Sequence, residues 1–257
     1  MELIKSVARR SKLSDVVYIT LNLAVAAAVL VLTVAFQPPY VAYLLVVVSK
    51  WRVFAVRPRF WWANFQTNMV DLVVGICAVT LIWQASGTFI IQLLLAVLYA
   101  AWLLIIKPRS SRKFMILQAG ISQFLGLTAL FSVAHFLDSS IIVALCFLIG
   151  LATARHILSS YDDEDITLLS VIWGFLLAEL GWLCYHWVVA YDITTSLLLP
   201  QVAILAGLLG FVTIRFYDAK YHKKSLAKHL RAPVIFSLAV LSILLVRELS
   251  VIFNYTS

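Results

Sequence analysis

Long apolar runs, separated by short polar segments, follow one another along almost the whole chain. A helix needs about 20 apolar residues to cross the hydrocarbon core of a bilayer, and a helix satisfies its own backbone hydrogen bonds there. We therefore predict an all-α fold, a polytopic transmembrane helical bundle of about nine spans, in which one helix is followed by four helical hairpins. The predicted spans are residues 16–36, 38–49, 69–85, 88–106, 114–136, 139–158, 166–190, 194–216 and 233–253.

Composition supports a single integral membrane domain over residues 1–257. Of the 257 residues, 63% are hydrophobic and 12% are charged, whereas a soluble domain has roughly 45–50% apolar and about 25% charged residues. Nine spans with short loops use nearly all positions, so no separate soluble domain is expected. The run from Val16 to Phe36 is too long for the apolar core of a signal peptide, and we interpret it as a retained first span.

The second span is the weakest of the nine. Only Pro39 to Ser49 is cleanly apolar, and Lys50 and Arg52 follow directly. Long cationic side chains can reach the interface from about one turn inside a helix end. On that basis the span can continue as far as Val56.

Basic residues predict the orientation. When the loops are assigned to alternate sides, all but one of the 20 Lys and Arg residues fall on the same side, and the exception is Arg247. The positive-inside rule makes the basic side cytoplasmic, so the N-terminus is expected in the cytoplasm and the C-terminus outside. This pattern accounts for the net charge of +8 without a nucleic-acid partner. Compact loops are typical of a bacterial cytoplasmic membrane protein.

Cations alternate with aromatic side chains where predicted inner turns meet the bilayer. Such segments place rings at the interface and charges on anionic lipid headgroups, which makes the bilayer and its anionic lipids the expected partners. Two turns, Arg57-Pro58-Arg59 and Lys107-Pro108-Arg109, resemble each other, either through an internal duplication or because two spans with loops have about this length. The predicted headgroup contacts are Lys50, Arg52, Arg57, Arg59, Trp61, Trp62, Lys107 and Arg109.

Residues 160–165 form an acidic cluster. Its carboxylates, Asp162, Asp163 and Asp165, are weak candidates for binding a divalent cation and through it a phosphate. The alternative is structural, with Ser160 as N-cap of the seventh span and carboxylates in its first turn. Asp71, three residues after Asn68 at the start of the third span, receives the same capping interpretation.

One carboxylate, Glu179, lies near the middle of the predicted span 166–190. A charge there costs roughly 2.5–3.5 kcal/mol on insertion scales, so we expect Glu179 to pack inside the bundle beside polar partners. His186 follows two turns later on nearly the same face, and two further polar residues lie in the outer half of the bilayer. The predicted intramembrane polar site comprises Glu179, His186, Gln201 and Arg247.

No catalytic residue, resident metal or cofactor is assigned. The cysteines, Cys77, Cys146 and Cys184, lie inside spans without CxxC spacing, and no phosphate loop or nucleophile motif occurs. The leading interpretation is a non-enzymatic scaffold or subunit of a membrane protein assembly, with other membrane subunits as partners. The alternative is a transporter or lipid-handling protein that uses the Glu179 site. A weaker alternative is an intramembrane enzyme acting on a lipid phosphate at the acidic cluster.

Overall fold

A computed structural model describes residues 12–51, 55, 57–161, 164–187, 189–194 and 197–256. Among these residues the chain forms nine α-helices, as predicted, and one small antiparallel hairpin. It divides into two compact units, Met1–Ala203 and Ile204–Ser257, which are described separately. That the two units form one membrane domain remains a prediction.

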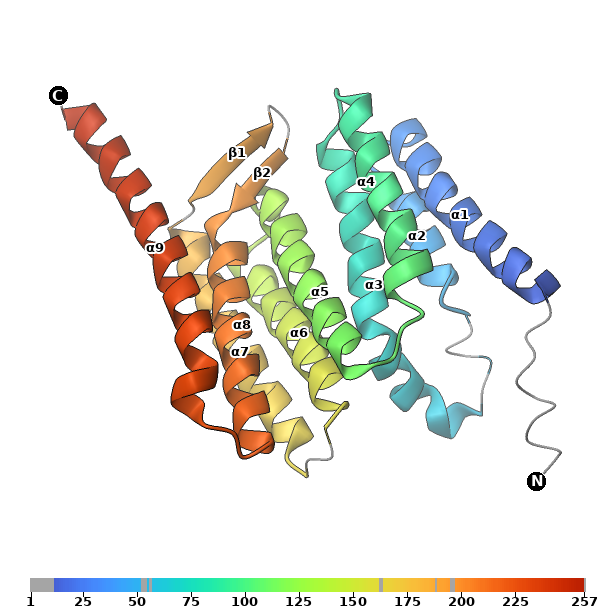
Figure 1. The fold of residues 1–257 in the computed structure, drawn as a ribbon. Coiled ribbons are helices and arrows are strands. Elements are labelled where there is room, and N and C mark those ends of the chain that lie inside the picture. The colour runs from blue at the N-terminus through green and yellow to red at the C-terminus, as the bar shows by residue number, and fades with distance from the viewer. Residues whose placement is uncertain are drawn as a thin grey trace. The chain divides into compact units, whose positions relative to one another are not determined.

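The first unit is built on seven helices. They are α1 (Lys12–Ala35), α2 (Tyr40–Val48), α3 (Trp61–Gln84), α4 (Phe89–Ala101), α5 (Arg112–Ser132), α6 (Ser139–Leu158) and α7 (Ile166–His186). Short helical turns precede α3 (η3, Pro58–Phe60), continue α4 (η4, Trp102–Ile106) and follow α5 (η5, Ala134–Phe136). Figure 1 shows consecutive helices of this unit running in alternate directions, as short connections require.

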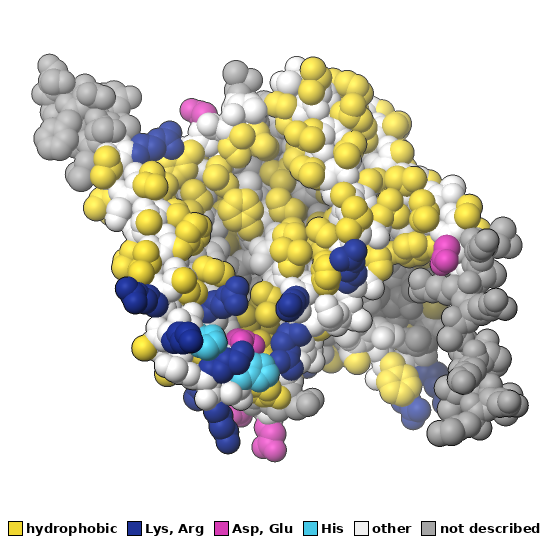
Figure 2. Space-filling view, in the orientation of Figure 1, with side chains coloured by type: hydrophobic (Ala, Val, Ile, Leu, Met, Phe, Trp, Pro, Cys, Tyr) yellow, Lys and Arg dark blue, Asp and Glu magenta, His cyan; other side chains and the backbone are white. Residues whose placement is uncertain are grey.

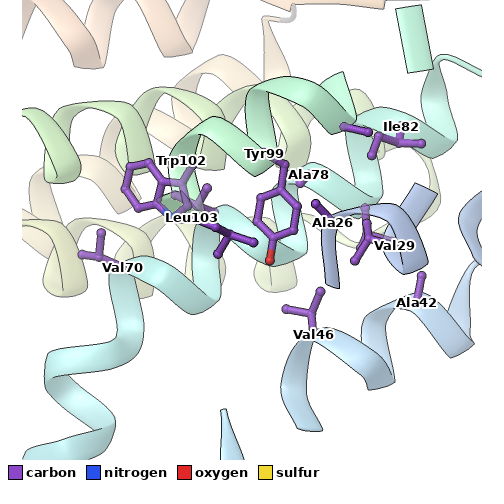
Figure 3. Close-up of a cluster of buried hydrophobic side chains, with 13 residues drawn as sticks. Ala26, Val29, Ala42, Val46, Val70, Ala78, Ile82, Tyr99, Trp102 and Leu103 are labelled. Carbon is purple, nitrogen blue, oxygen red and sulfur yellow. The ribbon is translucent and has the colours of Figure 1, made fainter. Parts of the chain in front are cut away.

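Packing in the first unit links α3 to most of its neighbours. α3 contacts α1, α2, α4, α5 and α6, and α7 packs against α6. The largest buried apolar cluster lies where α1 to α4 meet and includes Val29, Val46, Ile82 and Leu103 (Figure 3). In the same view Tyr99 points from α4 toward Val46 of α2. The cluster includes Val70 of α3 and Trp102 of η4, and it therefore borders the polar site described in the next section.

Eight helices are long and apolar enough to cross a membrane, counting only the described residues. The predicted span 38–49 is the exception. α2 has nine residues, about 13 Å of helix at 1.5 Å per residue, and a bilayer core is about 30 Å thick. α2 is therefore too short to span the core by itself.

The segment between α7 and α8 differs from the prediction. α7 ends at His186, and residues predicted as span ends and an outer turn form strands β1 (Ala190–Thr194) and β2 (Leu197–Pro200). The strands pair antiparallel, with Tyr191 opposite Leu199, and β2 packs against α5. Pro200 precedes the first helical residue of α8, consistent with the restriction that proline imposes on its neighbours.

The second unit contains most of α8 (Gln201–Tyr221) and all of α9 (Leu226–Thr256). Phe211 and Phe236 pack edge to face between these helices, with ring centroids 6.2 Å apart. At their connection Asp218 pairs with His222 at 3.4 Å and with Lys224 at 3.5 Å. α9 begins before the predicted span 233–253 and contains Pro233 within the helix.

Apolar side chains cover much of the face seen in Figure 2, and most of the Lys and Arg side chains on this face lie in the lower half of the view. Leu94, Val97 and Leu98 of α4 and Leu21 and Val31 of α1 are examples of large exposed apolar residues. Such a surface is stable against lipid and unstable against water. Together with the helix lengths it identifies a multi-spanning membrane protein.

Candidate functional site

The first unit buries a carboxylate, Asp71, in the interior of α3. Pro58 begins the helical segment, so α3 starts eight positions before the predicted span and Asp71 lies in its third turn. Its side chain is 9% exposed. The prediction that Asp71 caps the start of a helix is therefore wrong, because the helix begins well before it.

Three donors from two parts of the chain, the end of α2 and the η4 turn, surround this carboxylate. Lys50, which follows α2, and Lys107, which follows η4, both donate from Nζ to Oδ2 of Asp71, the second at 2.7 Å. The indole Nε1 of Trp102 donates to Oδ1 at 3.0 Å. Both carboxylate oxygens are thus satisfied by charged or aromatic N–H donors. We call Asp71, Lys50, Lys107 and Trp102 the Asp71 cluster.

The Asp71 cluster carries one positive charge in excess, with two ammonium groups against one carboxylate. Lys50 is buried, with its side chain 11% exposed, whereas the side chain of Lys107 is 33% exposed. Because the side chain of Lys107 is the more exposed of the two lysines, the excess positive charge faces the surface through Lys107.

A π-helical turn, η4, places Trp102 and Lys107 on the same carboxylate. The N–H of Lys107 donates to the carbonyl of Trp102, five residues earlier, at 2.9 Å. Side chains from other helices bind carbonyls of this turn. Tyr18 Oη of α1 donates to Leu103 at 3.1 Å, and Gln118 Nε2 of α5 donates to Ile106 at 2.7 Å. π-turns occur frequently at functional sites.

Polar contacts continue from this turn toward α6 and α7. Gln118 Oε1 lies 2.8 Å from His156 Nε2 of α6. One turn along α5, Gln123 Oε1 accepts from Trp173 Nε1 of α7 at 2.9 Å and from Thr153 Oγ1 of α6 at 3.4 Å. These polar side chains therefore bind one another, as buried polar groups in a low-dielectric interior must.

Replacing Trp102 with phenylalanine should remove one donor from Asp71 while retaining most of the ring volume. We expect a loss of about 1.5 kcal/mol, because hydrogen bonds to charged groups contribute about that much, and a Tm lower by about 5 °C in detergent. Trp182→Phe on the exposed face of α7 is the matched control. An unchanged Tm for Trp102→Phe would show that the indole does not support the carboxylate.

The predicted intramembrane polar site has a different setting. Glu179 is an exposed residue of α7, and its packing inside the bundle stays a prediction. It has no ion pair or hydrogen bond with any residue that the structure describes. With Val143, Ala178 and Trp182 it lines an open depression on the surface of α6 and α7.

The three predicted partners of Glu179, which are His186, Gln201 and Arg247, each have a different setting. His186 is exposed and contacts the rings of Trp182 and Tyr185 on its own helix. Gln201 begins α8, and its backbone N–H donates to the carbonyl of Val189 at 2.8 Å. Arg247 belongs to the second unit. A polar site that combines all four residues stays a prediction.

The predicted headgroup contacts divide into two groups. Lys50 is mostly buried against Asp71, with its side chain 11% exposed, and its contact with a lipid headgroup stays a prediction. Arg57, Arg59, Trp61, Trp62 and Arg109 are exposed and Lys107 is partly exposed, while Arg52 lies outside the described residues. The guanidinium of Arg59 lies over the ring of Phe60 at 4.6 Å, and that of Arg109 lies over Phe114 at 4.4 Å.

The acidic cluster is described only in part. Asp162 and Asp163 lie outside the described residues, so a metal site with Asp165 stays a prediction. Asp165 is the N-cap residue of α7. Ser160 is not a cap of that helix, because its hydroxyl donates to the carbonyl of Ile157 at the end of α6, at 2.7 Å.

The chain matches no protein-family model, no curated protein and no solved structure. Function must therefore be argued from the geometry of the described residues.

Proposed function

We propose that the protein is a non-enzymatic subunit of a larger membrane assembly, and that α7 binds a transmembrane helix of another protein. The observation that carries this proposal is the exposure of Glu179 in the middle of an apolar helix face. Four large apolar side chains at helical spacing surround it on α7 and are each exposed by about half. They are Phe175, Leu176, Trp182 and Leu183.

The depth of Glu179 makes its exposure unfavourable in lipid. Glu179 precedes His186, the last residue of α7, by about 10 Å at 1.5 Å per residue, which places it well inside a core of about 30 Å. A carboxylate facing acyl chains there costs roughly 2.5–3.5 kcal/mol. A neighbouring helix that offers a hydrogen-bond donor or a cation at this depth removes that cost.

Charge selects the kind of partner. A symmetric contact between two copies of α7 would bring two Glu179 carboxylates together, because an isologous interface pairs the same surface on both subunits. Like charges in a low-dielectric setting repel strongly. The surface therefore favours a different protein whose transmembrane helix carries a lysine, arginine or histidine opposite Glu179.

The test is site-specific photo-crosslinking in native membranes, with the crosslinker at Leu183. We expect one discrete adduct whose linked peptide is a transmembrane segment with a basic residue near the crosslink. Glu179→Ala should abolish the adduct, and exchanging the charges between Glu179 and that basic residue should restore it. Glu164→Ala, at the exposed start of the α7 segment, is the matched control.

Other outcomes contradict the proposal in distinct ways. An adduct within the same chain, lost in Arg247→Gln, would show that Glu179 serves an internal pair. A crosslinked segment without a basic or polar residue would contradict the proposal, because such a segment offers no partner to the Glu179 carboxylate. In the purified protein, Glu179→Leu should leave the Tm unchanged or raise it, and a lower Tm would assign Glu179 a structural role.

Transport at Glu179, His186, Gln201 and Arg247 is the second candidate, and the open depression beside Glu179 favours it. A transporter coupled to protons needs an ionisable carboxylate that reaches water. In that case Glu179→Gln should abolish proton movement into proteoliposomes while the protein stays folded. The docking proposal instead expects Glu179→Gln to retain the crosslinked adduct, because a hydrogen bond survives.

A further inference from the structure

The turn after η4, Lys107-Pro108-Arg109, is held at both ends by hydrogen bonds. The amide of Gln118 donates to the carbonyl of Ile106 at 2.7 Å and to that of Arg109 at 2.8 Å, so one buried side chain fixes both ends of the turn. Lys107 is fixed further by Asp71 at 2.7 Å. The two cations of the turn are therefore presented in a defined arrangement.

These two cations are not fully neutralised by the chain. Lys107 shares its carboxylate with Lys50, which leaves one positive charge in excess. Arg109 is exposed and rests on the ring of Phe114 at 4.4 Å, and it has no ion pair with any described residue. A guanidinium held by its face on a ring keeps its N–H edge available for a bidentate acceptor.

We propose that this turn binds the phosphate group of an anionic phospholipid through Arg109 and Lys107. A phosphodiester offers two acceptor oxygens that match the fork of a guanidinium, and an ammonium group supplies a second point charge. The turn ends a membrane-spanning helix, where lipid phosphates are the most abundant anions. This inference is independent of the partner proposed for α7.

Gln118 acts as a positioning residue for this site. It carries no charge, it is buried, and its Oε1 is itself fixed by His156 at 2.8 Å. Replacing it with leucine removes no charge from the turn but releases the carbonyls of Ile106 and Arg109 that position it. If the turn is a specific site, Gln118→Leu must lower its affinity for the lipid. If a basic surface only attracts anionic lipid diffusely, the affinity must stay the same.

The experiment is a titration of the full-length protein in non-ionic detergent with short-chain phosphatidylglycerol, followed by native mass spectrometry. We expect Arg109→Gln to lower the affinity about fivefold, as expected for about 1 kcal/mol per charge at a membrane surface. Lys220→Gln, an exposed lysine at the end of α8, is the charge-matched control and should retain the affinity. Lys107→Gln serves as a second variant after its fold has been checked by Tm.

Three outcomes would overturn the proposal. Equal losses in Arg109→Gln and Lys220→Gln would indicate diffuse electrostatics rather than a site. Unchanged affinity in a folded Gln118→Leu variant would show that the turn is not built for the ligand. Inorganic phosphate that competes with the lipid at equal concentration would assign the turn to a soluble phosphate instead of a headgroup.

Discussion

Replacing Asp71 with leucine is expected to lower the free energy of unfolding by about 3–5 kcal/mol, the effect of removing one partner from a buried ion pair. The substitution leaves the ammonium group of Lys50 in the interior without its carboxylate. It also removes the acceptor that Trp102 and Lys107 share. Since the donors follow α2 and α4 and the carboxylate belongs to α3, all three helices should loosen together.

Thermal unfolding in detergent measures this effect, and we expect a Tm lower by roughly 10 °C. Asp192→Leu, at an exposed aspartate of β1, is the matched control and should have little effect. The combined variant with Lys50→Met and Lys107→Met should recover much of the loss, because apolar replacement of a whole buried ion cluster is often neutral. A single Asp71→Leu variant as stable as the control would refute the structural role of the cluster.

A second large effect is expected at the contact between α6 and α7. A Cβ added to Gly174 would lie 3.0 Å from the carbonyl oxygen of Phe147, and one added to Gly150 would lie 3.0 Å from the Cα of Gly174. Small residues allow helix backbones to approach this closely in membranes. Gly174→Leu should therefore separate the two helices and destabilise the protein by about 3 kcal/mol.

The measurement is again the Tm, supplemented by crosslinking between cysteines introduced at exposed ends of α6 and α7. Gly120→Leu provides the control, because no atom lies within 4 Å of a Cβ built at Gly120. That substitution should be neutral or slightly stabilising, since glycine is a poor helix former. Similar effects of the two leucine substitutions would contradict the close-packing argument.

The helical architecture could be predicted because the bilayer requires long apolar runs and closed backbone hydrogen bonding. The boundaries were less predictable. Residues 61–68 mix aromatic and polar side chains and were not counted in a span, although Pro58 at the first turn signals a helix start. Counting from Pro58 would have placed Asp71 well inside the span rather than at its start, and would have marked it as an intramembrane charge that needs a partner.

The partners of Asp71 could not be read from the sequence. Lys50 resembles any cation that follows a span, and its burial results from the short length of α2 and the packing of α3 beside it. Trp102 resembles an interfacial ring until η4 turns its indole toward α3. For Glu179 the sequence predicts a position deep in the bilayer, but its exposure depends on which face of α7 meets α6. Small residues at Gly174, Ala178 and Gly181 decide that face.

The π-turn at Trp102–Ile106 has a consequence for the charge of the Asp71 cluster. A π-turn contains one residue more than the corresponding stretch of α-helix, and each residue of an α-helix turns the direction of its side chain by about 100°. If this segment were wound as a regular α-helix instead, the side chain of Lys107 would be turned by roughly 100° away from Asp71. The π-turn and the second ammonium group of the cluster are therefore useful only in combination, and a change that restores the regular helix takes one cation away from Asp71.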